Sequence, residues 1–223
     1  MGTEFGRRSR EWQREWCSTV RSMVIELPPP GFCVVDVRRS NVNYVVRHFM
    51  VSKVRGMFRR FNSKIAVAED VTASSVFVAV EMASIDTGDG KRDTVIVGEE
   101  FLDTGRHPAM ASESDRVVAL SRGWVVDGSV TIHGVTRPVS MPVFFNGACL
   151  DSRGNTHASF SARMFLDRND FGLSFNQPLE SGGMVLGNVV TIELEIDAVR
   201  EAGEGAGSGQ GWKRHLSSRL IRL

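Results

Sequence analysis

Apolar and polar positions alternate along most of the chain between residues 31 and 200. A period of two with one apolar face runs through residues 76–82, 126–132, 139–143, 158–162 and 190–198. Such alternation places one face of a strand against a core and leaves the other in water, which is typical of antiparallel sheets. Turn-forming residues lie between these segments: DTGDG at 86–90, HGVTRP at 133–138 and DSRGN at 151–155. We therefore predict strands joined by tight turns.

Only residues 89–100 and a stripe near the N-terminus have a helical pattern. A sheet with a wet face and no covering helices has to pack on a second sheet or close on itself, and closure removes its edge strands. Residues 31–200 have room for about eight strands of roughly 10–12 residues with their turns. We therefore expect an all-β fold: an antiparallel eight-stranded barrel, closed or nearly closed, with one short helix and an apolar lumen.

The chain divides into three zones. Residues 1–30 carry a stripe at helical steps of three and four, followed by three prolines that end any helix; the stripe consists of Trp12, Trp16, Val20, Val24 and Leu27. Residues 31–200 form the predicted barrel. Residues 201–223 begin with a Gly-rich linker and end in a basic tail. We expect both ends to lie outside the barrel, with the N-terminal stripe either packed on it or unfolded.

The basic tail has hydrophobic residues at helical spacing, namely Trp212, Leu216, Leu220 and Leu223. Its four Lys and Arg side chains and its lack of acidic ones favour an anionic membrane surface, at about 1 kcal/mol per basic residue. Because so short a helix is marginal in isolation, an unfolded solubilising tail is the alternative. The sequence therefore leaves two alternatives for residues 212–223, peripheral membrane contact or an unfolded tail.

Composition and charge exclude several classes of protein. Lys and Arg number 27 against 26 Asp and Glu, so there is no basic excess to attract nucleic acid. The 42% of apolar residues argues against a chain disordered throughout, and no apolar run approaches the roughly 18 residues of a membrane span. The N-terminal arginines are followed by no apolar run of a secretory signal, and the three cysteines are scattered. We expect a cytoplasmic protein with reduced thiols.

The spacing of residues gives little support to catalytic or metal chemistry. The chain has no GxSxG motif, which argues against a Ser–His–Asp hydrolase. His133 lies beside a glycine turn, where a ring nitrogen can hold the turn by a hydrogen bond. His48 and His107 could join it around a metal, but no HxH or HExxH spacing occurs. We therefore expect no enzymatic activity, no metal and no cofactor.

Five strings follow one another in the predicted barrel: VVDVRRSNVNYVVRHFMVSKVRGMF, VEMASIDTGDGKRD, EEFLDTGRHP, GSVTIHGVTRPVSMPV and ASFSARMFLDRNDFGLSFN. In this order they closely resemble the YceI-like family of polyisoprenoid-binding proteins, over about residues 31–200. The resemblance implies an extended lipocalin-like barrel whose tunnel holds a long isoprenoid, quinone-like or fatty-acyl chain. It further implies a carrier rather than an enzyme, a bound amphipathic lipid in place of a cofactor, and a homodimer.

Under that resemblance, the inward face of the predicted strands is the lining of a lipid tunnel. The candidates for this lining are Val76, Val78, Val80, Met82, Val130, Ile132, Val143, Phe160, Ile192 and Leu194. Met82 and Met141 suit a ligand of variable shape, because thioethers adapt to their surroundings. The alternative is that the same side chains fill the barrel as an ordinary core. The protein is then a structural or interaction barrel recruited to membranes by its basic tail.

Five polar residues match family positions and are candidates for contact with a lipid head group or for the tunnel mouth: His48, Arg92, Asp93, His133 and Arg168. We expect Arg92–Asp93 and Arg168–Asp170 to be local ion pairs that fix loops. Two positions depart from the family pattern, because Arg39 and Val95 stand where histidines are usual. These changes remove imidazoles near the expected mouth and leave the preference for a head group open.

Overall fold

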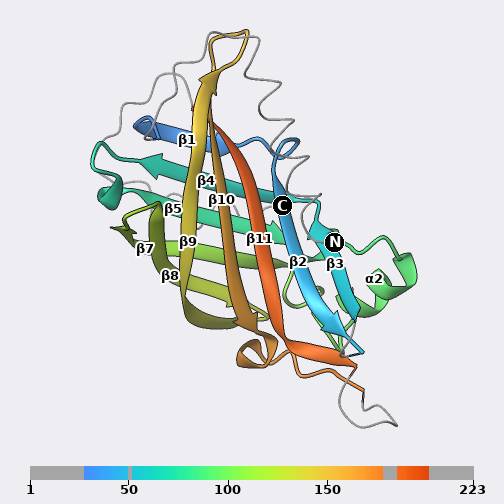
Figure 1. Ribbon diagram of the computed structural model, residues 1–223. Helices are drawn as coiled ribbons and strands as arrows, with labels where there is room; N and C mark the ends of the chain where they lie inside the picture. Colours follow the sequence, from blue (N-terminus) through green and yellow to red (C-terminus); the bar gives the residue numbers. More distant parts are fainter. Residues whose placement is uncertain (1–27, 50–51, 178–184, 201–223) are drawn as a thin grey trace.

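The computed structural model describes residues 28–49, 52–177 and 185–200; the N-terminal stripe, the Gly-rich linker and the basic tail lie outside them. The described strands are β1 (Gly31–Val35), β2 (Asn41–His48), β3 (Ser52–Phe58), β4 (Phe61–Val67), β5 (Ser75–Glu81), β6 (Ile85–Asp86), β7 (Ala109–Ala119), β8 (Trp124–Ile132), β9 (Val135–Leu150), β10 (Thr156–Asp167) and β11 (Leu186–Arg200). The described helices are α2 (Gly90–Val97) and the short 3-10 turns η1 (Val71–Ala73), η2 (Met82–Ser84) and η3 (Arg168–Phe171). The described part of the chain is thus mostly strands with one short α-helix, as expected (Figure 1).

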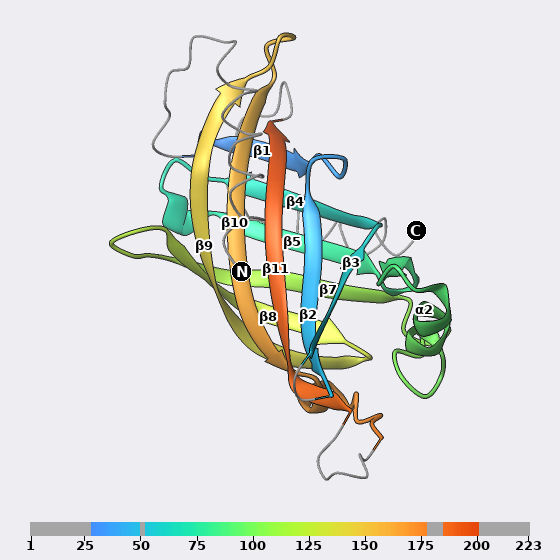
Figure 2. The ribbon, with the colours of Figure 1, turned by 45° about the vertical axis from the view of Figure 1, so that its right-hand side comes forward.

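The described strands form one sheet in the order β1-β4-β5-β7-β8-β9-β10-β11-β2-β3-β6. A further pairing of β1 with β11 closes the first eight of these into an antiparallel barrel, which confirms the predicted fold. β11 has two partners along one edge: its C-terminal end pairs with β1 at Cys33↔Arg200, and the part before it pairs with β2. β2, β3 and β6 therefore extend the sheet beyond the closed ring, on the side where α2 lies (Figures 1 and 2).

The chain passes from β1 to β2 while staying bonded to β11. The main-chain N–H of Asp36 donates to the carbonyl of Asp197 at 2.8 Å. The Ser40 hydroxyl donates to the same carbonyl at 3.3 Å and accepts from the N–H of Asp197 at 2.9 Å. These bonds span the break between the two strands, so they hold the point at which the barrel closes.

Local chemistry accounts for where several elements begin and end. The Asp89 carboxylate accepts from the main-chain N–H groups of Lys91 (3.1 Å) and Arg92 (3.3 Å), so the predicted turn at 86–90 leads into α2. The alternation predicted to continue to Met82 ends one residue earlier, because Met82 begins η2. There the Ser84 hydroxyl donates to the carbonyl of Glu81 at 2.6 Å.

Two predicted turns are tight hairpins that fix the register of β8, β9 and β10. His133 and Gly134 have φ angles of +51° and +75°, the left-handed conformation that a two-residue type I′ turn requires at both positions. At the next turn the Asp151 carboxylate accepts from the main-chain N–H groups of Arg153 and Asn155, each at 2.8 Å. A shift of one residue would turn every inward side chain outward, so these turns also set which face of each strand is buried.

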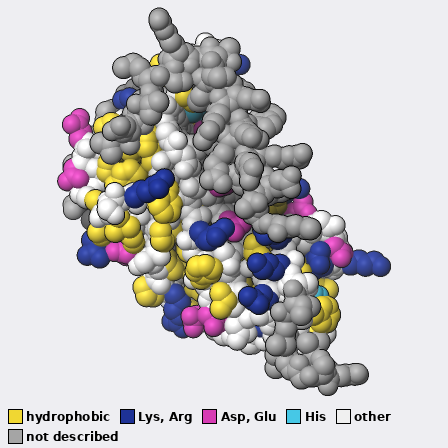
Figure 3. Space-filling model, in the orientation of Figure 1, with side chains coloured by type: hydrophobic (Ala, Val, Ile, Leu, Met, Phe, Trp, Pro, Cys, Tyr) yellow, Lys and Arg dark blue, Asp and Glu magenta, His cyan; other side chains and the backbone are white. Residues whose placement is uncertain are grey.

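The outer face of the barrel mixes charged with exposed apolar side chains. Phe144 on β9, Phe165 on β10 and Val189 on β11 are among the exposed large apolar residues. On the face shown in Figure 3, hydrophobic side chains form a band and basic and acidic side chains are interspersed around it. Within the described ranges, no helix has the length and hydrophobicity needed to cross a membrane.

Candidate functional site

The side chains of the barrel do not fill its interior. Two cavities lie inside, with volumes of about 330 Å³ and about 180 Å³. We call the larger the helix-side cavity, because residues of β2, β3, α2 and η3 line it, and the smaller the ring cavity, because strands of the closed ring surround it. Ordinary protein cores leave few voids larger than a water molecule. The described side chains therefore leave more open space in the barrel than such a core has.

The two cavities adjoin. Met110 on β7, Leu166 on β10 and Ile192 on β11 line both of them. These three side chains form a partition between two parts of one apolar interior. Met110 is unbranched and has three rotatable bonds, so it can change conformation at low cost.

The structure places all ten predicted lining residues at these cavities. Seven of them line the ring cavity: Val76, Val78, Val80, Val130, Val143, Phe160 and Leu194. Met82 and Ile132 line the helix-side cavity, and Ile192 lines both. The alternation of apolar positions thus identified the inward face of five strands, although contact with a lipid stays a prediction.

The five polar candidates separate into two groups. His48, Arg92 and Arg168 line the helix-side cavity, whereas Asp93 and His133 line neither cavity. The helix-side cavity also includes the amides of Asn176 and Gln177. The basic and amide side chains of the interior therefore gather at its helix-side end, whereas the polar residues that line the ring cavity are serines and Glu113.

Arg92 and Asp93 contact Thr87 and do not pair with each other. The Arg92 guanidinium donates from Nε to the Thr87 hydroxyl at 2.9 Å, and its charged neighbour is Asp89 at 4.0 Å. The Asp93 carboxylate accepts from the Thr87 hydroxyl at 2.6 Å and from its main-chain N–H at 3.1 Å. The predicted Arg92–Asp93 ion pair is wrong, because both side chains turn back along the helix to hold its entry loop.

Arg168 is a buried structural residue, with only 4% of its surface exposed. Its guanidinium donates to the carbonyl oxygens of Leu173, Phe175 (2.8 Å) and Gly187 (3.2 Å). Burial lowers the pKa of Arg168 below its usual value. The predicted ion pair with Asp170 is not formed, because main-chain carbonyls take the donors and tie the segment after η3 to β11.

Tyr44 is a functional candidate that the sequence reasoning missed. It lies on β2, lines the helix-side cavity and is only 8% exposed. Within the described part of the chain, its buried hydroxyl has no hydrogen-bond partner. A buried hydroxyl without a partner costs about 1–3 kcal/mol, so such groups are uncommon and call for an explanation.

The surroundings of Tyr44 explain its position. The ring lies over Gly56, its partner on β3, where any Cβ atom would collide with it. Burial raises the pKa of the Tyr44 hydroxyl well above 10, the negative charge of Asp93 adds to this, and the positive charge of Arg92 opposes it. The hydroxyl therefore stays protonated and can act as a donor. The one clue in the sequence was that this chain has a single tyrosine, placed in a predicted strand.

The two departures from the family pattern lie in different places. Val95 lines the helix-side cavity, whereas Arg39 lines neither cavity. Arg39 contacts Asp36 at 3.5 Å and Asp197 at 4.0 Å, beside the junction of β1 and β2. Only the change at Val95 therefore alters the lining of the interior.

His133 does not hold its turn in the way the sequence suggested. Within the described residues, its ring makes no hydrogen bond to the turn and lies instead against the ring of His107, with centroids 4.3 Å apart. The turn is formed by the left-handed backbone of His133 and Gly134. The imidazole is therefore available for another role.

Comparison with known proteins identifies a family for most of this chain. The YceI-like domain matches residues 34–198, which is most of the barrel. A UPF0312 protein of Vibrio cholerae is 28% identical over 172 residues, covering 75% of this chain and 87% of that protein. All residues that line the cavities, except Pro28, thus lie within the matched region.

Solved structures show the same fold at low sequence identity. Burkholderia cenocepacia BcnA has a TM-score of 0.63 at 19% identity, covering 73% of this chain and 98% of that protein. A polyisoprenoid binding domain from Saccharophagus degradans has a TM-score of 0.56 at 14% identity, covering 78% of this chain and all of that domain.

Proposed function

The chain belongs to the YceI-like family, and from this we propose that it is a non-catalytic carrier that holds a long amphipathic lipid inside its barrel. The lipid is a polyisoprenoid, an isoprenoid quinone or a similar chain. The observation that carries the proposal is the pair of adjoining cavities, which share three apolar lining residues. The polyisoprenoid binding described for the Saccharophagus degradans domain supports the ligand class.

The cavities suit an apolar chain on physical grounds. A volume of about 330 Å³ is within the range of pockets that enclose small ligands, and the ring cavity extends it. Each methylene group removed from water contributes about 0.8 kcal/mol. A long chain therefore needs few polar contacts to bind tightly.

We place the polar head of the lipid at the helix-side end. Tyr44 has an unused donor there, and Arg92 and His48 line the same cavity. The ring cavity is lined mainly by Val, Ile, Leu, Met and Phe, which suits the tail. In this orientation the tail crosses the partition at Ile192.

Native mass spectrometry of the purified protein tests the proposal. We expect a co-purifying lipid, or binding of an added prenyl quinone after the protein has been stripped of lipid. Val130→Trp, which fills the ring cavity, should weaken binding at least tenfold, and Val189→Trp on the outer face of β11 is the matched control. The milder Leu194→Phe is a second plug in case the first misfolds, and circular dichroism checks each fold.

Two results contradict the carrier proposal. One is a stripped protein that binds none of a polyprenol, a prenyl quinone and a fatty acid. The other is unchanged lipid affinity in a folded variant with a plugged ring cavity. Turnover of a bound lipid by the wild type, lost in His133→Asn, would contradict the absence of catalysis.

Docking on membranes through residues 212–223 stays a proposal, because these residues lie outside the described part. Flotation with anionic liposomes, with and without residues 201–223, tests it. Loss of flotation on truncation, together with no lipid bound in the barrel, favours the alternative of a structural barrel recruited to membranes. The cytoplasmic location and the homodimer also stay predictions.

A further inference from the structure

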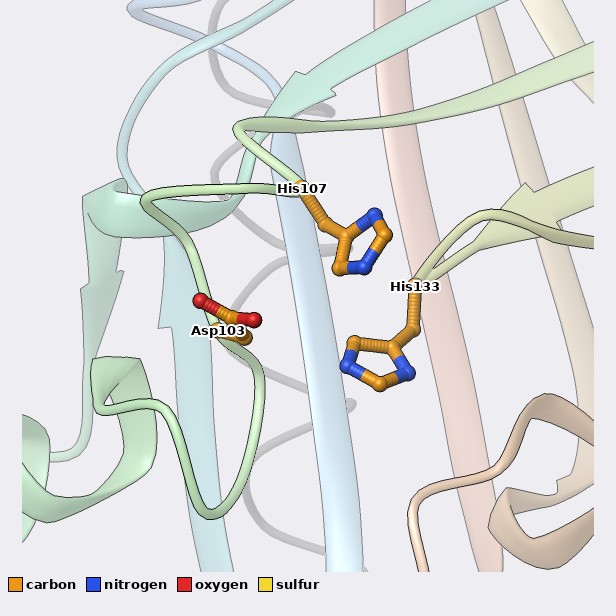
Figure 4. Close-up of side chains that lie close together, drawn as sticks. All are labelled: Asp103, His107 and His133. Carbon is orange, nitrogen blue, oxygen red and sulfur yellow. The ribbon is translucent and has the colours of Figure 1, made fainter.

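Three polar side chains outside both cavities converge from separate loops. Asp103 and His107 come from the segment between α2 and β7, and His133 is the first residue of the β8–β9 turn. One ligand atom from each, a carboxylate oxygen and two ring nitrogens, lies within 4.8 Å of the others. Figure 4 shows the carboxylate and both rings turned toward one another.

The cluster is enclosed but not bonded together. Asp103 is 7% exposed and both histidines are partly buried. Within the described residues, no hydrogen bond joins the side chains of any two of the three, and the nearest cation to the Asp103 carboxylate is the largely exposed Arg106 at 3.6 Å. A buried carboxylate normally requires a close cationic or hydrogen-bonding partner, and the exposed Arg106 is a weak partner for Asp103.

The turns that carry the three side chains are held by the main chain and not by the side chains themselves. The carbonyl of Asp103 accepts from the N–H groups of Arg106 at 3.0 Å and His107 at 2.8 Å, which forms a tight loop. Asp103 and His133 have φ angles of +44° and +51°, in the left-handed region. Asparagine adopts this conformation at least as readily, so the turn alone does not call for an imidazole at residue 133.

We propose that Asp103, His107 and His133 bind a divalent transition-metal ion of the Zn²⁺ class. Two neutral imidazoles and one carboxylate, with water at the remaining position, are a common ligand set for such ions. Metal–ligand distances of about 2.0–2.2 Å place ligand atoms about 3.3–3.6 Å apart at tetrahedral angles. Binding therefore requires side-chain rotations that bring the ligand atoms, now within 4.8 Å of one another, to that spacing.

The site joins the loop before β7 to the β8–β9 turn. Leu102 and Ile132, the chain neighbours of Asp103 and His133, line the helix-side cavity. A bound ion therefore fastens two parts of the cavity wall from outside the lumen. The proposal stands apart from lipid carriage, because none of the three ligands lines either cavity.

Isothermal titration of tag-free, chelator-treated full-length protein with Zn²⁺ tests the site, and Co²⁺ absorption reports its coordination. We expect one ion per chain, with affinity reduced at least 30-fold in His107→Phe, in His133→Asn, which keeps the left-handed turn, and in Asp103→Asn. His215→Gln is the matched control, expected to bind Zn²⁺ within threefold of the wild type. Zn²⁺ should also raise the Tm of the wild type and not that of His107→Phe.

Two outcomes overturn the proposal. One is wild-type protein that takes up no Zn²⁺ or Co²⁺. The other is a folded His107→Phe or His133→Asn variant that binds as tightly as the wild type, which would place the ion elsewhere, for example at His215. Lipid binding measured on the same samples keeps this result separate from the carrier proposal.

Discussion

At the scale of single residues, Tyr44 and Ser63 are the described residues with a buried hydroxyl that lacks a hydrogen-bond partner, and Tyr44 is the one at the helix-side cavity. Its hydroxyl is buried at the helix-side cavity without a partner in the described residues, while its ring fits closely against Gly56. A group in this state destabilises the protein without ligand and gains most from a ligand that accepts a hydrogen bond. We therefore expect the Tyr44 hydroxyl to lower the stability of the lipid-free protein and to strengthen lipid binding.

Tyr44→Phe separates the two effects. Removing the hydroxyl should raise the free energy of unfolding of the stripped protein by about 1 kcal/mol, because the uncompensated burial is relieved. The same change should weaken the binding of a prenyl quinone about tenfold and leave the binding of the hydrocarbon squalene unaffected. Urea denaturation and a fluorescence binding assay measure these quantities. Equal loss for both ligands would show that the hydroxyl does not contact the head group.

For Arg168 we expect a substitution to lower stability, in contrast to Tyr44→Phe. Arg168→Lys should lower the free energy of unfolding by about 2–4 kcal/mol, because an ammonium cannot reach the separate carbonyls that the planar guanidinium serves. Arg163→Lys is the matched control: its pair with Glu193 at 2.8 Å is exposed and should change stability by less than about 0.5 kcal/mol. Similar small losses in both would assign Arg168 to the ligand rather than to the fold.

At the scale of elements, turns and caps set the register on which the lumen depends. Hairpins at 133–134 and 151–155 position three long neighbouring strands, and Asp89 starts α2 beside the cavity. We expect the Asp151 turn to be sensitive to pH. The amide of Asn155 and main-chain N–H groups hold the pKa of the Asp151 carboxyl well below its usual range.

Because the pKa of Asp151 is lowered on folding, its charged form stabilises the native state above the ordinary value near 3.8, and this contribution disappears as the pH falls further. Asp151→Asn should therefore be less stable than the wild type at pH 7, and the difference should shrink below about pH 4. Urea midpoints at several pH values measure this. Asp115→Asn, on an exposed part of β7, is the control, and a gap that does not vary with pH would refute the assignment.

At the scale of the whole molecule, closure of the ring produces the interior and its partition. Cys33 on β1 and Arg200 on β11 lie near opposite ends of the barrel sequence and are paired in the sheet. The lumen exists only once that pairing forms. Met110, Leu166 and Ile192 then separate the two cavities. Under the proposed lipid carriage, we expect this partition to set the length of the bound chain.

Ile192→Ala should join the two cavities. We expect longer polyprenols to gain affinity over shorter ones, while the stripped protein loses about 2 kcal/mol of stability, the lower end for such truncations, because the site already borders empty space. A chain-length series followed by native mass spectrometry measures this shift. Val189→Ala on the outer face of β11 should leave the preference unchanged, and an unchanged preference in Ile192→Ala would show that the partition does not limit chain length.

The sequence by itself located five of the described strands, β5 and β8 to β11, together with the short helix and the inward face of those strands. Val76, Val130 and Ile192 were assigned to the interior because a strand has a strict period of two, and one buried residue fixes the facing of the others. The ordered family motifs identified the barrel type. These are local properties, and local pattern was enough to predict them.

Only the tertiary structure decided which distant groups meet. The partition, the unpartnered hydroxyl of Tyr44 and the convergence of His107 with His133 depend on contacts between segments far apart in the chain. Arg168 shows a related limit, because its charge suggested a neighbouring carboxylate, whereas the folded chain supplied the carbonyls of Leu173 in the loop after η3 and of Gly187 on β11. A pattern along the chain gives the direction in which a side chain points, whereas the closed barrel determines what lies there.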